Sequence, residues 1–188
     1  MLKYKINKIE YSIYDKGYWS GNACIRIIFS GCNLECKSCE SNNISNNEYT
    51  IIKILKEIEQ YKCRYIILTG GEPLIQNIAF LVDELRRNNY YVILKTNGTQ
   101  SVIGVTVNWI IISPKTKQLH RSFNHKAPNE IDYTITEHNP IYKYPFNCKR
   151  KYLIPMRNDK TLIRRCVNII KEKNDWRLSL NIKDMIND

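Results

Sequence analysis

The stretch ACIRIIFSGCNLECKSC, residues 23–39, carries the strongest structural signal in this chain of 188 residues. Its first part, residues 23–29, is rich in β-branched and apolar side chains and ends at Ser30-Gly31, which predicts a β-strand followed by a turn. The loop after it holds three cysteines, spaced Cys32-x-x-x-Cys36-x-x-Cys39. Three thiolates cannot complete the ligand set of a four-iron cluster, so one iron stays open to bind and activate another molecule. The spacing therefore favours an open catalytic iron–sulfur site.

The alternatives for these cysteines are a zinc site and a disulfide with one spare thiol. Zinc needs a fourth ligand, but no histidine precedes His120 and Cys63 stands alone. The seven cysteines are an odd number, which suits a reducing compartment better than a disulfide framework. The N-terminus lacks the pattern of a signal peptide, and no apolar run reaches the length of a membrane span. We expect a cytoplasmic protein without a membrane segment.

Length and composition predict one globular domain over residues 1–188, with 43% hydrophobic and 25% charged residues. The net charge of +11 is unusual, and its densest short run is Lys149-Arg150-Lys151. Such a charge is compatible with a lysine-rich solvated surface. It is also compatible with an anionic substrate, a nucleic acid or an acidic protein partner. Composition leaves these readings open.

Hydrophobic periodicity predicts alternating strands and helices along the chain. We expect strands near residues 23–29, 64–68, 90–94, 107–112, 130–136 and 151–154, and helices near 48–60, 75–88 and 160–172. Residues 116–129 resemble a loop. The alternation predicts an α/β fold with a mainly parallel sheet and right-handed crossovers. The strands are too few for a complete eight-stranded barrel, so we expect an incomplete TIM-type barrel.

A polar or glycine-rich motif follows each of the first four predicted strands. Ligands of parallel sheets bind at the carboxyl ends of the strands, so these motifs are expected to face one cleft. Glycines allow the backbone to approach a ligand closely, and Glu72 offers an acceptor for an ammonium group. The predicted ligand-binding residues outside the cysteine loop are Thr69, Gly70, Gly71, Glu72, Asn97, Ser113 and Lys115.

The cysteine spacing, with Gly70-Gly71-Glu72-Pro73 after the next strand, resembles the radical S-adenosylmethionine superfamily. The resemblance implies that Cys32, Cys36 and Cys39 ligate a 4Fe-4S cluster whose fourth iron binds S-adenosylmethionine. It also implies reductive cleavage of this cofactor to a 5′-deoxyadenosyl radical, which abstracts hydrogen from a substrate. An electron donor such as flavodoxin or ferredoxin would reduce the cluster.

Within the superfamily, the chain is most similar to the 7-carboxy-7-deazaguanine synthases. The matching segments run from about residue 30 to residue 180 and include Thr96-Asn97-Gly98-Thr99, Ser113-Pro114-Lys115 and Trp176-Arg177-Leu178-Ser179-Leu180. This similarity implies ring contraction of 6-carboxy-tetrahydropterin, a lyase reaction on the route to queuosine-type bases. It also implies a possible magnesium ligand at Ser41, for which a loop hydroxyl bonded to its own backbone is the alternative. A homodimer is plausible from the family alone.

Several substrate-side residues of that family are changed here. Its N-terminal Gln-Gly-Glu-Gly stretch corresponds to Tyr14-Asp15-Lys16-Gly17, and its glutamate before Thr-Asn-Gly-Thr is Lys95. The family's arginine four residues before the first cysteine is Ile28, and Arg26 is expected on the same side of the strand. Ile154 and Lys183 replace a glutamine and a histidine. The substrate-side candidates are therefore Tyr14, Arg26 and Lys95.

Three functions follow from these observations. The first is a radical enzyme that acts on a small anionic pterin. The second is a radical enzyme with another substrate: a nucleotide, a peptide, or a glycyl radical enzyme that it activates. The third is a cluster-containing binding or regulatory protein without turnover, against which the intact Glu72 and three cysteines argue.

Overall fold

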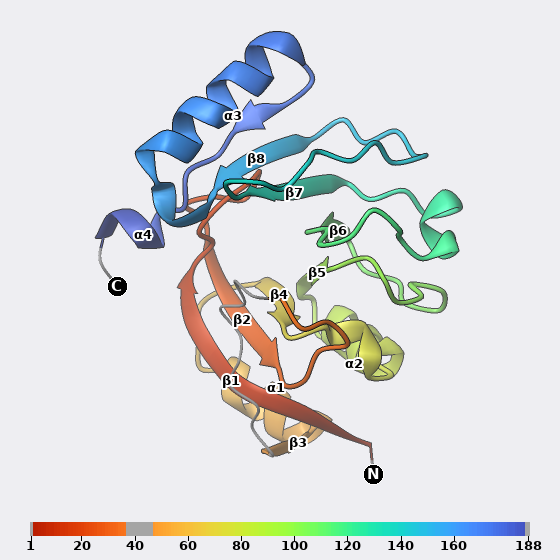
Figure 1. Ribbon diagram of the computed structural model, residues 1–188. Helices are drawn as coiled ribbons and strands as arrows, with labels where there is room; N and C mark the ends of the chain where they lie inside the picture. Colours follow the sequence, from red (N-terminus) through yellow and green to blue (C-terminus); the bar gives the residue numbers. More distant parts are fainter. Residues whose placement is uncertain (1, 37–46, 187–188) are drawn as a thin grey trace.

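In the computed structural model, a curved nine-stranded sheet forms the centre of the protein (Figure 1). The structure describes residues 2–36 and 47–186, so Cys39 and Ser41 lie outside the described residues. The strand order is β3-β1-β2-β4-β5-β6-β7-β8-β9. The strands are β1 (Lys3–Ile13), β2 (Ala23–Phe29), β3 (Glu48–Thr50), β4 (Tyr65–Gly70), β5 (Tyr91–Thr96), β6 (Trp109–Ile112), β7 (Glu130–Ile135), β8 (Lys151–Pro155) and β9 (Arg177–Leu178).

Every neighbouring pair from β2 through β9 is parallel, while β1 is antiparallel to both β2 and β3. The sheet is curved without closing into a complete barrel, and α1, α2 and α3 lie on its outer side (Figure 1). The predicted incomplete barrel with a mainly parallel sheet is confirmed. No helix among the described residues is both long and apolar enough to cross a membrane.

Alternation along the strands separates the two faces of the sheet. On the outer face, apolar side chains such as Ile27 and Leu68 pack beneath the helices in the main core. A second outer cluster joins β7 and β8 to α3 (Lys160–Glu172) and Trp176. On the inner face there is a small apolar cluster around Tyr14 and Ile93. The polar residues of the inner face, which are not part of this apolar cluster, can therefore line a ligand-binding cavity.

The helices are shorter than the predicted ones at two places. Helix α1 (Ile51–Ile58) begins after β3 because Glu48–Thr50 pair with β1, and the Thr50 hydroxyl accepts a hydrogen bond from the Lys53 amide. Helix α2 (Ala79–Arg87) follows a separate 3-10 turn, η1 (Pro73–Ile75). Helix α3 spans residues 160–172 as predicted, because Asp159 caps the amides of Thr161 and Leu162.

Sequence periodicity missed strand β1 as well as β3 and β9. Strand β1 lies next to the edge of the sheet and carries charged residues on one face. It therefore contains no continuous apolar run that would indicate a strand. The predicted loop 116–129 contains a 3-10 turn, η2 (Arg121–Asn124). The C-terminal residues form η3 (Met156–Asn158) after β8 and a short helix, α4 (Lys183–Ile186), after β9. These additions matter because β1 and α4 both contribute to the cavity.

Candidate active site

The cysteine loop leaves the carboxyl end of β2, as predicted. Gly31 adopts a φ of +85°, which turns the chain away from the strand. Cys32 is exposed and Cys36 is half-buried, and both line one cavity. The Cys32 sulfur lies 3.4 Å from the Leu34 amide nitrogen and 3.9 Å from the side-chain nitrogen of Asn97. N–H groups around a thiolate suit a sulfur that ligates iron.

The Gly70-Gly71 turn packs directly against the start of this loop. A Cβ atom added at Gly71 would lie 1.8 Å from the backbone oxygen of Gly31. The Gly71 amide donates to Phe29 at 3.0 Å, and the Glu72 amide donates to Gly31 at 2.9 Å. Only glycine allows these two backbones to meet, so the turn and the cysteine loop form one continuous wall.

Glu72, a predicted cofactor-binding residue, also accepts hydrogen bonds from the chain itself. Its side chain is fully buried, and its carboxylate accepts hydrogen bonds from the Thr96 hydroxyl at 2.7 Å and from the amides of Asn97 at 2.7 Å and Leu74 at 3.1 Å. Burial raises the pKa of Glu72, although these donors act in the opposite direction. The chain itself supplies three donors to this carboxylate, and a contact with the cofactor's ammonium group stays a prediction. Glu72 ties the ends of β4 and β5 together, and the backbone around it borders the cavity.

The remaining cofactor-side residues reach the same cavity from the ends of β4, β5 and β6. Thr69, Asn97, Ser113 and Lys115 all line it. The side-chain nitrogen Nδ2 of Asn97 donates to the side-chain oxygen of Asn33 at 3.1 Å. This hydrogen bond joins the turn after β5 to the cysteine loop. The predicted convergence of four strand ends on one cleft is therefore present in the structure.

The cavity has a volume of about 690 Å³, which is large enough for a nucleoside cofactor and a small substrate. Seven cationic side chains line it, against two carboxylates, Asp15 and Asp184. The cations are Lys8, Lys16, Arg26, Lys95, Lys115, Arg157 and Lys183. This excess of positive charge predicts an anionic ligand.

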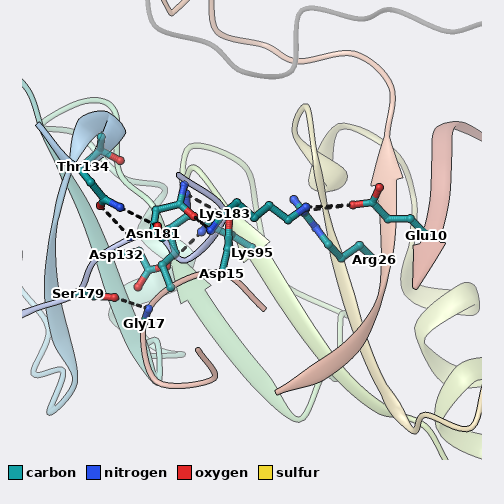
Figure 2. A network of polar contacts seen from close by, with 12 residues as sticks. Glu10, Asp15, Gly17, Arg26, Lys95, Asp132, Thr134, Ser179, Asn181 and Lys183 are labelled. Carbon is teal, nitrogen blue, oxygen red and sulfur yellow. Dashed lines mark hydrogen bonds and ion pairs between the residues drawn. The ribbon is translucent and has the colours of Figure 1, made fainter. Parts of the chain in front are cut away.

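Lys95 and Asp132 form the central ion pair of the inner face (Figure 2). Their side-chain atoms are 3.1 Å apart, and the Asp132 side chain is fully buried. Burial alone would lower the pKa of Lys95, but the carboxylates of Asp132, Asp15 and Glu130 outweigh it and raise the pKa. Lys95 thus remains charged at the position where the family resemblance implied a glutamate, and Asp132 balances it.

Arg26 lines the cavity, as predicted, and is held by a carboxylate of β1 (Figure 2). Glu10 lies 3.2 Å from Arg26, 2.6 Å from Lys8 and 3.6 Å from Lys183. Burial acts to raise the pKa of Glu10, but these three cations outweigh it and lower the pKa. One carboxylate therefore holds three cavity cations, and most of their positive charge stays uncompensated.

Tyr14 and Asp15 lie in the loop between β1 and β2 and also line the cavity. Tyr14 is 2% exposed, and burial together with the nearby carboxylates raises its pKa. Asp15 is buried too, yet Lys16, Lys95 and Arg26 outweigh burial and lower its pKa. The Asp15 carbonyl accepts the Ile182 amide at 2.9 Å, so the C-terminal segment holds this loop in place.

Below the ion pair lies Glu130, a fully buried carboxyl group. It accepts hydrogen bonds from the Tyr18 amide at 2.8 Å and from the Trp109 ring nitrogen at 3.0 Å. Burial first, and then Asp132, raise its pKa to about 8. The neighbouring Asp132 Oδ1 is buried without a hydrogen-bond donor from the rest of the described chain. A protonated Glu130 supplies that donor, which keeps a single negative charge for Lys95.

Sequence reasoning missed Glu10, Glu130, Asp132, Asn181 and Arg157. Asp132 and Thr134 alternate with apolar residues on β7, and this period-2 pattern could have placed them on the inner face. Glu10 and Asn181 carried no such signal, because Arg26 and Asn158, to which they bind, are distant in sequence.

The other cysteines, Cys24, Cys63, Cys148 and Cys166, are buried away from the cysteine loop, as expected of core residues.

The described residues fit a cluster and a nucleoside cofactor. Two cysteines line a wide cavity, amide groups approach the sulfur of one of them, and glycines form a close backbone wall beside them. Among the described residues there is no group of three or more metal-ligating side chains, and the third cysteine of the motif lies in the segment 37–46 that is not described.

Comparison with known proteins agrees with this geometry. A family model described as the Radical SAM superfamily matches residues 27–109. The 7-carboxy-7-deazaguanine synthase of Bacteroides thetaiotaomicron is 29% identical over 189 residues, which cover 97% of each chain. The enzyme of the same name from Buchnera aphidicola is 29% identical over 214 residues and covers 96% of this chain and 97% of its own.

A solved structure shows the same fold. The crystal structure of QueE from Escherichia coli superposes with a TM-score of 0.77 and 22% sequence identity, covering 95% of this chain and 94% of that one. The chain thus carries a match to the Radical SAM superfamily over residues 27–109 and is similar over nearly its whole length to the 7-carboxy-7-deazaguanine synthases, and it shares the fold of the solved structure.

Proposed function

We propose that this enzyme contracts the ring of 6-carboxy-tetrahydropterin in the manner of a 7-carboxy-7-deazaguanine synthase. The observation that carries the proposal is the cavity itself: the cysteine loop and the cation-rich inner face line one space of about 690 Å³. A small anionic substrate would therefore lie beside the cofactor. The full-length similarity to synthases of that name supports the choice of reaction.

Each end of the cavity has its own part in this proposal. Cys32, Cys36 and Cys39 would hold the cluster, and Gly70, Gly71, Thr69, Asn97, Ser113 and Lys115 would border S-adenosylmethionine. When bound and reduced, the cluster and this cofactor supply a carbon radical that abstracts hydrogen. Arg26 and Lys95 attract the anionic substrate, while Tyr14 and the apolar floor beneath it exclude water from one side.

Magnesium, an electron donor and the compartment complete the proposal. Ser41, the expected magnesium ligand, lies outside the described residues. The proposal that the enzyme uses magnesium therefore rests on family similarity alone. Flavodoxin or ferredoxin would deliver the electron that the cluster needs. The free thiols of the described cysteines suit the reducing cytoplasm.

The test is anaerobic reconstitution of the cluster, followed by turnover with S-adenosylmethionine, a reductant and 6-carboxy-tetrahydropterin, with and without magnesium. We expect 5′-deoxyadenosine and the contracted product by chromatography. Cys36→Ala should lose cluster absorbance and both products, whereas Cys63→Ala, which alters a cysteine outside the cavity, should retain them. Cleavage by Cys36→Ala would contradict a radical mechanism. Wild-type cleavage that leaves the pterin untouched would contradict only the substrate.

A radical enzyme with another substrate is the second candidate, and Lys95 is the observation that favours it. A cation stands where the related synthases are expected to carry a carboxylate, and Asp132 stabilises its charge. The same reconstituted enzyme should then cleave S-adenosylmethionine with a nucleotide, a peptide or a partner enzyme instead. The run Lys149-Arg150-Lys151 adds little to a nucleic-acid reading, because Arg150 stacks on Tyr18 and Trp109, and Lys151 pairs with Asp175 at 2.6 Å.

A further inference from the structure

Arg157 occupies an unusual backbone position at the carboxyl end of β8. It lies in the 3-10 turn η3 with a φ of +53°, and the next residue, Asn158, has a φ of +48°. Residues other than glycine seldom adopt this left-handed region, and two in succession persist only where the surrounding structure holds them. Such strain concentrates at functional sites.

The surroundings of η3 supply that restraint. The Asn158 side chain donates to the Asn181 carbonyl at 2.7 Å and accepts from the Asn181 amide at 2.9 Å. Asp159 follows directly, and its carboxylate caps α3 at the Thr161 and Leu162 amides. The turn is therefore fixed on both sides, by the C-terminal segment and by the helix.

The turn places Arg157 on the cavity wall at the same edge of the sheet as the cofactor-side loops. Most other cations of the wall have a partner within the chain. Lys8, Arg26 and Lys183 share Glu10, Lys16 pairs with Asp15, Lys95 pairs with Asp132, and Lys115 contacts Thr134 at 3.4 Å.

Arg157 forms no ion pair or hydrogen bond within residues 2–36 and 47–186. Two neighbouring acids form no ion pair with it: Asp159 caps a helix, and Asp184 also lines the cavity but is not within ion-pair distance. A guanidinium has five N–H donors in a planar fork that matches a carboxylate in two-point fashion. This side chain therefore retains its full capacity for an anionic ligand.

We propose that Arg157 binds a carboxylate of the substrate and is a specificity-determining residue of this enzyme. The inference rests on the proposed function, because it takes the cavity to hold a small anionic substrate beside the cofactor. Arg157 provides the two-point contact, and the cations around Glu10 provide the field that draws the anion in. S-adenosylmethionine also carries a carboxylate, so the test must separate the two sources.

The test combines ligand pairs with protein variants. Binding of pterin-6-carboxylate and of 6-methylpterin, which lacks the carboxylate, is measured by calorimetry on the anaerobic holoenzyme with S-adenosylmethionine present. The wild type should prefer the carboxylate by about tenfold or more, the value of a hydrogen-bonded charged pair. Arg157→Gln should abolish this preference, and Arg157→Lys should keep part of it. Arg121→Gln removes an exposed arginine outside the cavity and should change nothing.

Three results would overturn the inference: an undiminished preference in Arg157→Gln, no preference in the wild type, or a loss confined to S-adenosylmethionine affinity. Thermal unfolding of Arg157→Gln checks that the turn still folds. Turnover of 6-carboxy-tetrahydropterin by the wild type is recorded separately. A wild type that binds the carboxylate selectively without turnover would contradict the proposed reaction and leave the role of Arg157 intact.

Discussion

At the end of the cavity proposed to hold the cofactor, glycine backbone packs closely beside the cysteine loop, whereas the end proposed to hold the substrate is lined by charged side chains. Gly70 and Gly71 press against the strand and loop beside them, and Glu72 ties two strand ends through three hydrogen bonds. At the other end, Lys95 and Arg26 are each held by a carboxylate from another strand. Backbone packing tolerates few changes, while ion pairs can be rearranged between relatives. This difference explains why the cofactor motifs are retained while the substrate-side residues are altered.

The largest effect is expected from Gly71→Ala. The added methyl group would lie 1.8 Å from the Gly31 carbonyl oxygen, so one of the two backbones must move and the Glu72–Gly31 hydrogen bond is lost. We expect about 3 kcal/mol of destabilisation and loss of most S-adenosylmethionine cleavage. Chemical denaturation and 5′-deoxyadenosine formation measure both.

Gly104→Ala is the control for backbone strain without a clash, because Gly104 has a φ of +80° and no atom lies within 4 Å of an added Cβ, whereas Gly71 has a clash and no positive φ. It should cost only about 1–2 kcal/mol of backbone strain and leave cleavage unchanged. Equal effects of the two substitutions would show that the cofactor end does not depend on close backbone contact.

Lys95→Met should reduce S-adenosylmethionine cleavage less than Gly71→Ala does but cost at least as much stability, because it leaves the fully buried Asp132 carboxylate without its cation. Removing one partner of a buried pair costs about 3–5 kcal/mol. Adding Asp132→Asn to this variant should recover most of the loss, and the free energies of unfolding of the four proteins form a double-mutant cycle. Cluster absorbance should stay intact throughout, since the pair lies at the substrate end. Additive effects would mean that the two charges are not coupled.

The smallest effect on S-adenosylmethionine cleavage is expected from Glu130→Gln, whose effect on stability depends on pH. The folded protein holds the Glu130 proton up to a pKa of about 8, whereas the unfolded chain releases it near the ordinary value of 4.5. Wild-type stability should therefore fall as pH rises between these values, and the glutamine variant should lack this part of the decline. Urea unfolding at pH 5, 6.5 and 8 measures the gap. Parallel curves for the two proteins would show that Glu130 is not protonated in the folded state.

Strands β2 and β4 to β8, the helix over residues 160–172 and the cofactor-side loops were predictable because their signals are local. Apolar runs mark the strands, glycines mark the turns, and the cysteine spacing lies within eight consecutive positions. Strand β1 was missed because only one of its faces is buried. The hydrogen bonds by which Glu72 joins β4 to β5 were not predicted, because the donors Thr96 and Asn97 lie about 25 positions away.

The sequence by itself determined the incomplete barrel, the cysteine loop and the edge of the sheet at which ligands gather, since each depends on neighbouring residues. Only the tertiary structure decided which charges meet. It paired Lys95 with Asp132 across 37 positions, gathered three cations around Glu10, and left Arg157 on the cavity wall without a partner among the described residues. Spacing along a chain predicts local geometry, but Coulomb energy depends on distances in space, and these are set when the strands assemble.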